Sequence, residues 1–270
     1  MLIDTHAHLD DKQFDADREE IIARSFGGGV EKIINIGAGL GSSRRSVELA
    51  EKHENIFAAV GLHPHYFMKH ETWGAEHKNQ LRELARESKV VAIGEVGLEY
   101  HFPDNATSEE QQNVLKMKQK EGFLFQIDLA IELDLPLIIH CREAYKETLE
   151  ILIEEKKKYG GKLRGVLHSY LGRSSYAKEF VNLDFLLGFN GIITYARDYD
   201  KVIREAGLGN MLLETDCPYL TPAPHKNERN EPAYVKYAAE KIAEIKGVSF
   251  EEVARATTEN AQKLFGVDFF

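Results

Sequence analysis

The strongest constraint on the fold is a regular alternation, along the whole chain, of short apolar segments with longer polar segments of helical periodicity. Eight apolar segments are typical of strands buried on both faces: the one leading into His6, and residues 32–36, 56–61, 90–94, 136–139, 163–167, 185–188 and 211–215. Consecutive parallel strands need a crossover of about a dozen residues or more, and most of the intervening segments are helical in pattern. The alternation therefore predicts a parallel α/β sheet.

The number of strand–helix units favours a closed barrel over an open sheet. Open doubly wound sheets often show a glycine-rich phosphate turn, but no G-x-G-x-x-G sequence follows a predicted strand here. Three glycines, Gly37, Gly39 and Gly41, follow the second strand at a different spacing. A length of 270 residues is ordinary for one barrel. We predict a single-domain (β/α)8 TIM-type barrel over residues 1–270, with the open sheet as the alternative.

The charge balance restricts the ways in which the chain can bind nucleic acid. Lys plus Arg number 34 and Asp plus Glu 44, giving a formal net charge of −10. This charge argues against non-specific coating of nucleic acid, which depends on neutralised phosphates, but a nuclease can hold a chain end through metals and local cations. We find no signal-peptide pattern and no membrane-length apolar run. Two cysteines, Cys141 and Cys217, are expected as small buried residues, and the chain as a cytoplasmic protein.

Residues that carry chemistry gather at the ends of the predicted strands. His6 and His8 are one residue apart, so both rings point to the same side of a strand, and His63 and His65 repeat the spacing. In a barrel the carboxyl ends of all strands share one rim, where catalytic groups lie. Eight residues fall there: His6, His8, His63, His65, Glu95, His140, His168 and Asp216. One such residue alone is usually a satisfied core side chain, but a cluster predicts a metal site.

The composition of this cluster predicts two metal ions. A catalytic tetrahedral ion takes three protein ligands, and four imidazoles with two carboxylates exceed that number. Nitrogen and oxygen ligands without thiolates suit zinc, manganese, iron or a magnesium-like ion; we expect Mg²⁺, Mn²⁺ or Zn²⁺, and the sequence does not distinguish among them. Two cations roughly 3.5–4 Å apart lower the pKa of a bridging water and stabilise both attacking and leaving oxygens. Such chemistry serves phosphodiester hydrolysis and also some amide hydrolysis.

Several stretches, taken together, resemble the TatD-type metal-dependent deoxyribonucleases, which belong to the wider amidohydrolase-like barrels. The matching stretches are Asp4–Leu9, Gly61–His65, Gly94–Leu98, Pro136–Arg142, Leu213–Leu220 and Arg229–Pro232. They extend over most of the chain, and the set is specific although each stretch alone is weak. The resemblance implies a barrel that hydrolyses DNA with the help of divalent metals.

The resemblance also implies a role for each matching residue. Six residues would hold the metals, with Glu95 as the bridge, His6, His8 and Asp216 on the first ion, and His140 and His168 on the second. His63 would contact the scissile phosphate or orient the attacking water, and Asp216 would take the proton of that water. Substrate contacts are expected from four further residues: His65, Arg142, Arg229 and Asn230.

Two positions depart from the family pattern. Glu99 stands where the family usually has an aspartate, and we assign it no role, so Glu99→Ala is expected to leave metal content unchanged. In contrast, Glu95→Ala is expected to abolish activity and most occupancy of the second metal. Tyr170 stands where a phenylalanine is commoner. It could stack on a base or sugar, as could Tyr100 and Phe102, but ordinary packing is the expected role of all three.

The preferred functional hypothesis is a deoxyribonuclease acting on DNA ends or single strands. The alternative enzyme is a hydrolase of amides, lactones or small esters, whose metals are often bridged by a modified lysine after the fourth strand, where this chain has Glu95. A non-catalytic metal-binding barrel is the alternative of another class, since a fold does not prove chemistry. DNA is the expected partner, and no membrane is expected. The sequence does not specify the oligomeric state, and a monomer is compatible with it.

Overall fold

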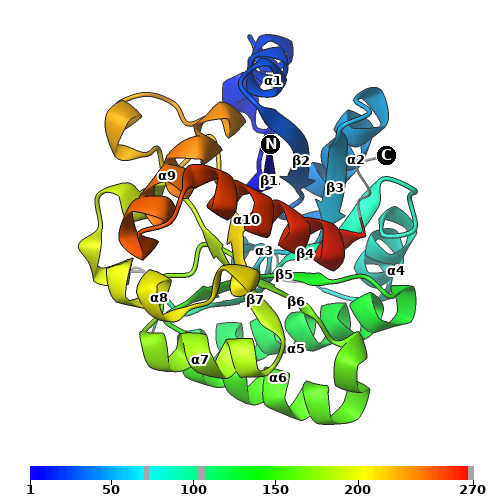
Figure 1. Cartoon of the computed structure of the whole chain (residues 1–270). Helices are drawn as coiled ribbons and strands as arrows, with labels where there is room; N and C mark the ends of the chain where they lie inside the picture. Colours follow the sequence, from blue (N-terminus) through cyan, green and yellow to red (C-terminus); the bar gives the residue numbers. More distant parts are fainter. Residues whose placement is uncertain (70–72, 103–107, 267–270) are drawn as a thin grey trace.

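Eight parallel strands in chain order form the centre of the computed structural model, which describes residues 1–69, 73–102 and 108–266. The strands are β1 Leu2–Ala7, β2 Val30–Ile36, β3 Ile56–Val60, β4 Val90–Glu99, β5 Leu137–Arg142, β6 Gly165–Leu167, β7 Phe185–Phe189 and β8 Met211–Leu213. Each strand is hydrogen-bonded to the next, and Figure 1 shows the helices arranged around them. The predicted single-domain (β/α)8 barrel is thus confirmed.

The barrel closes between β1 and the segment that follows β8. Ala7 forms an isolated parallel bridge with Cys217. Two backbone amides strengthen this seam: Asp216 donates to the carbonyl oxygen of His6 and His8 donates to that of Cys217, both at 2.8 Å. The closure therefore joins two predicted metal ligands at the end of β1, His6 and His8, to a third that lies more than two hundred residues away in the sequence.

Most strands differ from their predicted bounds by one to five residues, and the differences at β4 and β8 have a clear physical cause. The strand predicted at 90–94 continues to Glu99, because it pairs with β5 over the added residues. The strand predicted at 211–215 ends two residues early, because the buried carboxylate of Asp4 binds the next segment instead. That carboxylate accepts hydrogen bonds from the backbone amide of Thr215 at 2.9 Å and from its hydroxyl at 2.6 Å. These contacts hold the chain after β8 against β1.

Ten α-helices occur in the described residues and cover the outside of the barrel. They are α1 Arg18–Gly27, α2 Leu40–Lys52, α3 Pro64–Lys69, α4 Ala75–Leu84, α5 Glu109–Leu133, α6 Tyr145–Tyr159, α7 Ser174–Asn182, α8 Asp200–Glu205, α9 Val235–Lys246 and α10 Phe250–Phe265. The short helix α3 was not predicted. Helix α5 begins with a capping box, in which Ser108 and Gln111 satisfy each other's backbone amides. None of the described helices has the length and apolar composition needed to cross a membrane.

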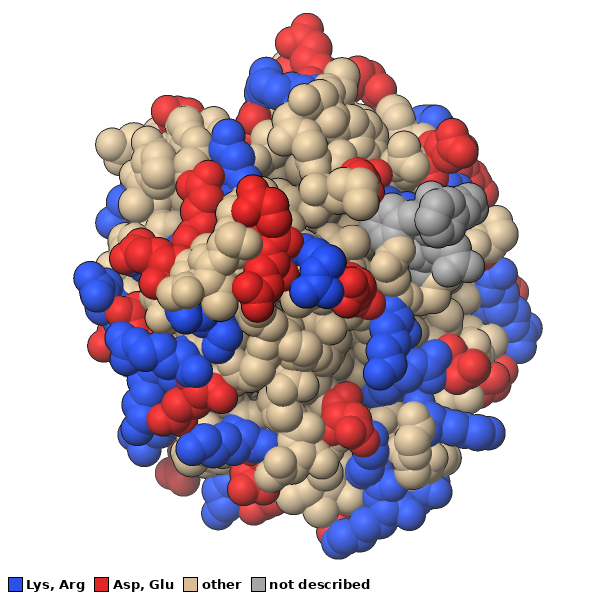
Figure 2. Space-filling model, viewed as in Figure 1, with Lys and Arg blue, Asp and Glu red and all other residues tan. Residues whose placement is uncertain are grey.

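Helix α10 closes the amino end of the barrel. Three of its residues, Ala261, Leu264 and Phe265, belong to the same buried cluster as the inward-facing side chains of the strands. The Asn260 side chain also donates to the carbonyl oxygens of Leu208 and Met211, at the start of β8. Figure 1 shows α10 across the front of the barrel, and Figure 2 shows acidic and basic side chains interspersed on this face. The opposite, carboxyl end of the barrel is left for the functional groups.

Candidate metal centre at the carboxyl end of the barrel

The six predicted metal ligands lie together at the carboxyl end of the barrel. Each comes from a strand or from the segment just after one: His6 from β1, His8 after β1, Glu95 from β4, His140 from β5, His168 after β6 and Asp216 after β8. None of the six side chains is more than 17% exposed. The group is therefore largely screened from bulk water, which strengthens every charge interaction within it.

His6, His8 and Asp216 form a triangle of ligand atoms. The two Nε2 atoms are 3.3 Å apart, and Oδ1 of Asp216 lies 3.5 Å from Nε2 of His6 and 3.3 Å from Nε2 of His8. Ligand atoms about 2.0–2.1 Å from one tetrahedral ion are separated by about 3.3–3.4 Å. The triangle therefore has the size of one face of a tetrahedral coordination shell, and these three residues fit a shared cation.

The two carboxylate oxygens of Glu95 face different groups of ligands. Oε2 lies 3.8 Å from Nε2 of His6 and 4.0 Å from Nε2 of His8. Oε1 lies 2.9 Å from Nδ1 of His140 and 3.1 Å from Nε2 of His168. One carboxylate thus stands between a pair of imidazoles from β1 and a pair from β5 and β6, as a bridging ligand would.

Contacts behind the ligands fix which ring nitrogen faces the centre. Nδ1 of His8 lies 3.0 Å from the carbonyl oxygen of Ile36, which can only accept, so in the neutral ring Nε2 is left free to bind a cation. Nδ1 of His168 lies 3.3 Å from the buried carboxylate of Glu214, which also accepts the backbone amide of Ser169 at 2.6 Å. Such partners orient metal-binding histidines and make them better ligands.

His63 is the second predicted catalytic residue, and it is buried beside Glu95. Its Nδ1 accepts the backbone amide of His65 at 3.0 Å, so in the neutral ring the proton lies on Nε2. That Nε2 is 3.5 Å from Oε1 of Glu95. His63, Glu95 and His140 also form one group with ligand atoms all within 4.8 Å of one another. With this tautomer His63 is placed to donate a hydrogen bond into the centre.

Glu99 has a contact that the sequence analysis did not anticipate. Its carboxylate is buried, with Oε2 lying 3.1 Å from Nε2 of His140 and Oε1 accepting the backbone amide of His101 at 2.8 Å. Alternation along β4 puts Glu95, Gly97 and Glu99 on one face, and this was the available signal. Gly97 has φ +133°, and a Cβ there would collide with the carbonyl oxygen of His140. This close approach of β4 to β5 lets both glutamates reach one imidazole.

The histidines around Glu95 keep its carboxyl ionised. Burial by itself would raise the pKa of Glu95, but His63 and His168 hold it well below its usual range. Burial likewise opposes protonation of His168, yet the two facing carboxylates raise its pKa well above the ordinary value. Beside Asp216 the pKa of His8 rises to about 9 in spite of burial. In the metal-free protein, protons on imidazole rings therefore balance the negative charge of the carboxylates. A bound cation would balance the same charge.

The four predicted substrate contacts divide into two pairs. His65 and Arg142 are about half exposed and border the metal centre, each 3.9 Å from Glu99. Arg229 instead forms an ion pair with Asp17 at 2.5 Å and bonds the carbonyl oxygen of Gln13. Asn230 has no exposed surface, and its amide group donates to two backbone carbonyls. We therefore assign Arg229 and Asn230 a structural role in place of the predicted substrate contact.

The aromatic residues considered for stacking are mainly packed against the protein. Tyr170 is 1% exposed and donates its hydroxyl to the carbonyl oxygen of Arg173, so the expected packing role is confirmed. Tyr100 and Phe102 stack on each other with ring centroids 6.3 Å apart, and Nζ of Lys116 lies 4.9 Å from the Tyr100 ring. Both cysteines are buried, as expected.

Two cavities open on either side of the ligand group. One, of about 720 Å³, is bordered by His140, His168 and Asp216; its other charged lining residues are Arg142, Glu143 and Arg173, and we name it the cationic cavity. The other, of about 690 Å³, is bordered by His8, His63 and Glu95; its other charged lining residues are Asp10, Asp11 and Arg45, and we name it the acidic cavity. Both have the size of ordinary ligand sites.

Comparison with known proteins identifies the family. The family model described as TatD related DNase matches residues 3–266. A Bacillus subtilis protein described as uncharacterized metal-dependent hydrolase YabD is 42% identical over 270 residues, covering 99% of this chain and 100% of the relative. A Cronobacter sakazakii protein described as 3′-5′ ssDNA/RNA exonuclease TatD is 32% identical over 271 residues, covering 98% of this chain and 97% of the relative. The crystal structure of the Escherichia coli TatD homologue YJJV has a TM-score of 0.88 at 31% identity, covering 99% of this chain and 98% of that protein.

These matches extend over all eight strands and over every candidate ligand described above. They agree with the geometry, in which histidines and carboxylates from six places in the sequence meet at one end of the barrel. The histidines and carboxylates at the carboxyl end of the barrel are candidate metal ligands, and the chain belongs to the TatD-related DNase family of metal-dependent hydrolases.

Proposed function

We propose that this protein is a divalent-metal-dependent deoxyribonuclease that hydrolyses phosphodiester bonds at DNA ends or in single strands. The observation that carries the proposal is the position of Glu95, whose two carboxylate oxygens face separate groups of ligands. The family description and the exonuclease name of the Cronobacter relative support a nucleic-acid substrate. In this proposal Mg²⁺, Mn²⁺ or Zn²⁺ ions are bound at two adjacent positions.

The ligands divide between the two positions around Glu95. His6, His8 and Asp216 would hold one ion, while His140 and His168 would hold the other together with the bridging carboxylate. A pair of divalent ions supplies a hydroxide at neutral pH and neutralises charge on the phosphate. Asp216 lies at the border of the cationic cavity, where its carboxylate would accept the proton of the attacking water.

His63 would act on the phosphate from the acidic cavity. Burial, which outweighs the attraction of Glu95, lowers its pKa well below the ordinary value, so the ring is neutral at physiological pH. The backbone amide of His65 occupies Nδ1, which leaves the Nε2 proton as the only donor of the ring. His63 is therefore placed to donate a hydrogen bond to a phosphate oxygen or to the attacking water.

Metal-restored hydrolysis tests the proposal. The protein is stripped with a chelator, reloaded separately with Mg²⁺, Mn²⁺ and Zn²⁺, and its metal content is measured by elemental analysis. Each form is then assayed on end-labelled single-stranded DNA and on a panel of amides, lactones and carboxylic esters. We expect nucleotide release from DNA with at least one metal and no turnover of the panel. Turnover of the panel with DNA left intact would favour the alternative hydrolase. Metal binding without any turnover would favour the non-catalytic barrel.

The Glu95→Ala variant tests the bridging role. It should lose DNA hydrolysis and most occupancy of the ion held by His140 and His168, because it removes a ligand from both positions. Glu259→Ala is the matched control, since Glu259 is exposed on α10 at the other end of the barrel. Full metal content in Glu95→Ala would contradict the assignment of the bridge.

A further inference from the structure

The cationic cavity holds two guanidinium groups that are available to a ligand. Arg173 is exposed at the start of α7 and forms no ion pair with any residue that the structure describes. Arg142 is 55% exposed, and its nearest carboxylate oxygen belongs to Glu99, at 3.9 Å. The only other acid of this lining outside the ligand group, Glu143, is paired with His101 at 2.8 Å. The cavity therefore offers positive charge next to the metal centre.

The same cavity also offers surfaces for a base. The rings of Tyr145 and Tyr176 stack with centroids 5.9 Å apart at 24°. Leu171, which is 37% exposed, lies on the lining with Ile192 and Leu220. An aromatic ring with aliphatic neighbours suits a nucleobase, and guanidinium groups suit a phosphate. The lining thus combines the two kinds of group that bind a nucleotide.

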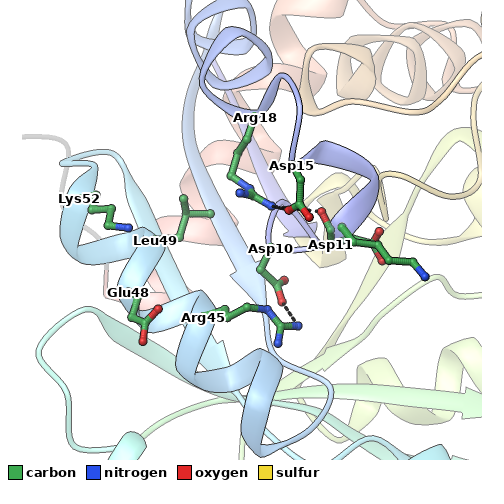
Figure 3. A pocket seen from close by; sticks show the side chains of 9 residues that line it. Asp10, Asp11, Asp15, Arg18, Arg45, Glu48, Leu49 and Lys52 are labelled. Carbon is green, nitrogen blue, oxygen red and sulfur yellow. Dashed lines mark hydrogen bonds and ion pairs between the residues drawn. The ribbon is translucent and has the colours of Figure 1, made fainter.

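The acidic cavity has the opposite charge. Apart from the ligand group it carries Asp10, Asp11 and a single guanidinium, that of Arg45, which is hydrogen-bonded to Asp10 at 3.0 Å. Figure 3 shows the neighbouring cavity of about 500 Å³, where Arg18 is likewise paired with Asp15 at 2.6 Å. Its charges balance: Asp10, Asp11, Asp15 and Glu48 against Lys12, Arg18, Arg45 and Lys52. This side therefore provides no net attraction for additional phosphates.

The segment after β8 separates the two cavities. Tyr219 borders the acidic cavity and Leu220, the next residue, borders the cationic cavity. The Tyr219 ring is 49% exposed and lies 6.3 Å from the ring of His8. An exposed ring at this place can receive one base beside the metal centre.

We propose that the cationic cavity binds the nucleotide next to the cleaved bond, with Arg173 and Arg142 on its phosphate, so that the strand reaches the metal centre from this side. The acidic cavity then receives the outermost nucleoside, which stacks on Tyr219. This nucleoside carries no further phosphate that the acidic residues would repel. This inference rests on the proposed function and makes the enzyme one that removes nucleotides from an end. It assigns to Arg173 and Tyr219 substrate contacts that the sequence analysis did not assign.

Comparison of a long and a short diester tests the role of Arg173. The substrates are a single-stranded oligonucleotide and bis(p-nitrophenyl) phosphate. The small diester has only the phosphate that is cleaved, so it has no second phosphate to place on the guanidinium groups. For Arg173→Gln, we expect kcat/KM on the oligonucleotide relative to the small diester to fall about tenfold, mainly through KM. Arg173→Lys should recover part of the loss. Arg255→Gln, an equal change of charge on α10, should not change the ratio.

A strand with one neutral linkage locates the contact. A methylphosphonate at the second linkage from the cleaved end should lower kcat/KM of the wild-type enzyme about tenfold and cause no further loss in Arg173→Gln. If Arg173→Gln behaves like Arg255→Gln, or if the neutral linkage costs both enzymes equally, the inference is overturned while the proposed function stands. If the metal-loaded wild type cleaves neither substrate, the proposed function fails and the inference with it.

Discussion

At the scale of single residues, Glu99 shows how a side chain outside the six predicted ligands can control the centre. Its carboxylate holds Nε2 of His140 at 3.1 Å, and this contact directs Nδ1 of the same ring toward Glu95 at 2.9 Å. A carboxylate in this position fixes the tautomer and raises the basicity of a metal-binding imidazole. Glu99 is therefore a positioning residue for His140.

We accordingly revise the expectation for Glu99→Ala. Loss of such a supporting carboxylate typically weakens metal binding about 10–100-fold, so the variant should lose metal from the position that includes His140 during dialysis at limiting metal. Glu99→Gln keeps an acceptor oxygen and should retain more metal than Glu99→Ala. Glu143→Ala, which removes a neighbouring carboxylate paired with exposed His101, is the control. Equal metal content in Glu99→Ala and in the control, measured by elemental analysis, would contradict the positioning role of Glu99.

Protonation of the ligands makes metal uptake depend on pH. An imidazole must be deprotonated to bind a metal, and in the metal-free protein Asp216 raises the pKa of His8 to about 9, against the effect of burial. Below pH 9 each binding event at His8 must therefore displace a proton. We expect the apparent affinity to rise with pH up to about 9, roughly tenfold per unit for each proton released. Calorimetric titration in buffers of different ionisation enthalpy measures the protons released, and none released at pH 7 would contradict the prediction.

The positions of the candidate ligands could be predicted from sequence because they depend on local rules. Alternation in a strand and the shared rim of a barrel together place His6, His8 and Glu95 without knowledge of any contact. The roles of Glu99 and Arg229 depend instead on partners far away in the sequence, His140 and Asp17. The role of Asn230 depends on how the loop before it folds back. No local pattern shows whether a charged side chain meets a substrate or another part of the chain.

At the scale of elements, the segment between β8 and α9 positions Asp216. Asn230 donates from Nδ2 to the carbonyl oxygens of Thr215 at 2.9 Å and of Tyr219 at 2.5 Å. Glu231, which follows it, forms two hydrogen bonds with Arg24 of α1. The Arg229–Pro232 stretch, from which substrate contacts were predicted, therefore holds in the structure the loop that carries Asp216, a candidate ligand.

Asn230→Ala should therefore destabilise the protein. The substitution leaves the buried carbonyl of Thr215 and the partly buried carbonyl of Tyr219 without this donor, which we expect to lower the free energy of unfolding by about 2–4 kcal/mol. Denaturant unfolding of the metal-free protein measures this change without interference from bound ions. A direct substrate role predicts the reverse: unchanged stability and a raised KM. His65→Ala, at an exposed residue of the rim, provides the comparison, because its stability should hardly change.

The extent of each strand was harder to predict than its existence. Apolar composition located all eight strands, since it is a property of each segment alone. The continuation of β4 to Glu99 depends on pairing with β5, and the early end of β8 depends on the carboxylate of Asp4, which takes the amide of Thr215. Both differences occur at the carboxyl rim, where strand ends are shaped by functional side chains.

At the scale of the whole molecule, the two ends of the barrel have different tasks. The carboxyl end holds largely buried histidines and carboxylates, whose mutual distances fit a bound cation. The amino end is closed by α10, whose Leu264 and Phe265 pack into the interior layer formed by strand residues such as Ile34 and Leu212. In barrels of this kind, stability and chemistry are therefore separable by position.

Phe265→Ala tests this separation. The ring is 6% exposed, and its removal from a packed layer should lower the free energy of unfolding by about 3–5 kcal/mol. Metal affinity of the folded variant should stay at the wild-type value, because no ligand lies near α10. Leu171→Ala at the opposite end is the control: its side chain is 37% exposed, and its stability should change by less than about 0.5 kcal/mol. Denaturant unfolding and metal titration, both well below the melting temperature, measure the two quantities separately. A Phe265→Ala protein that is folded but binds metal weakly would show that the amino end also supports the centre.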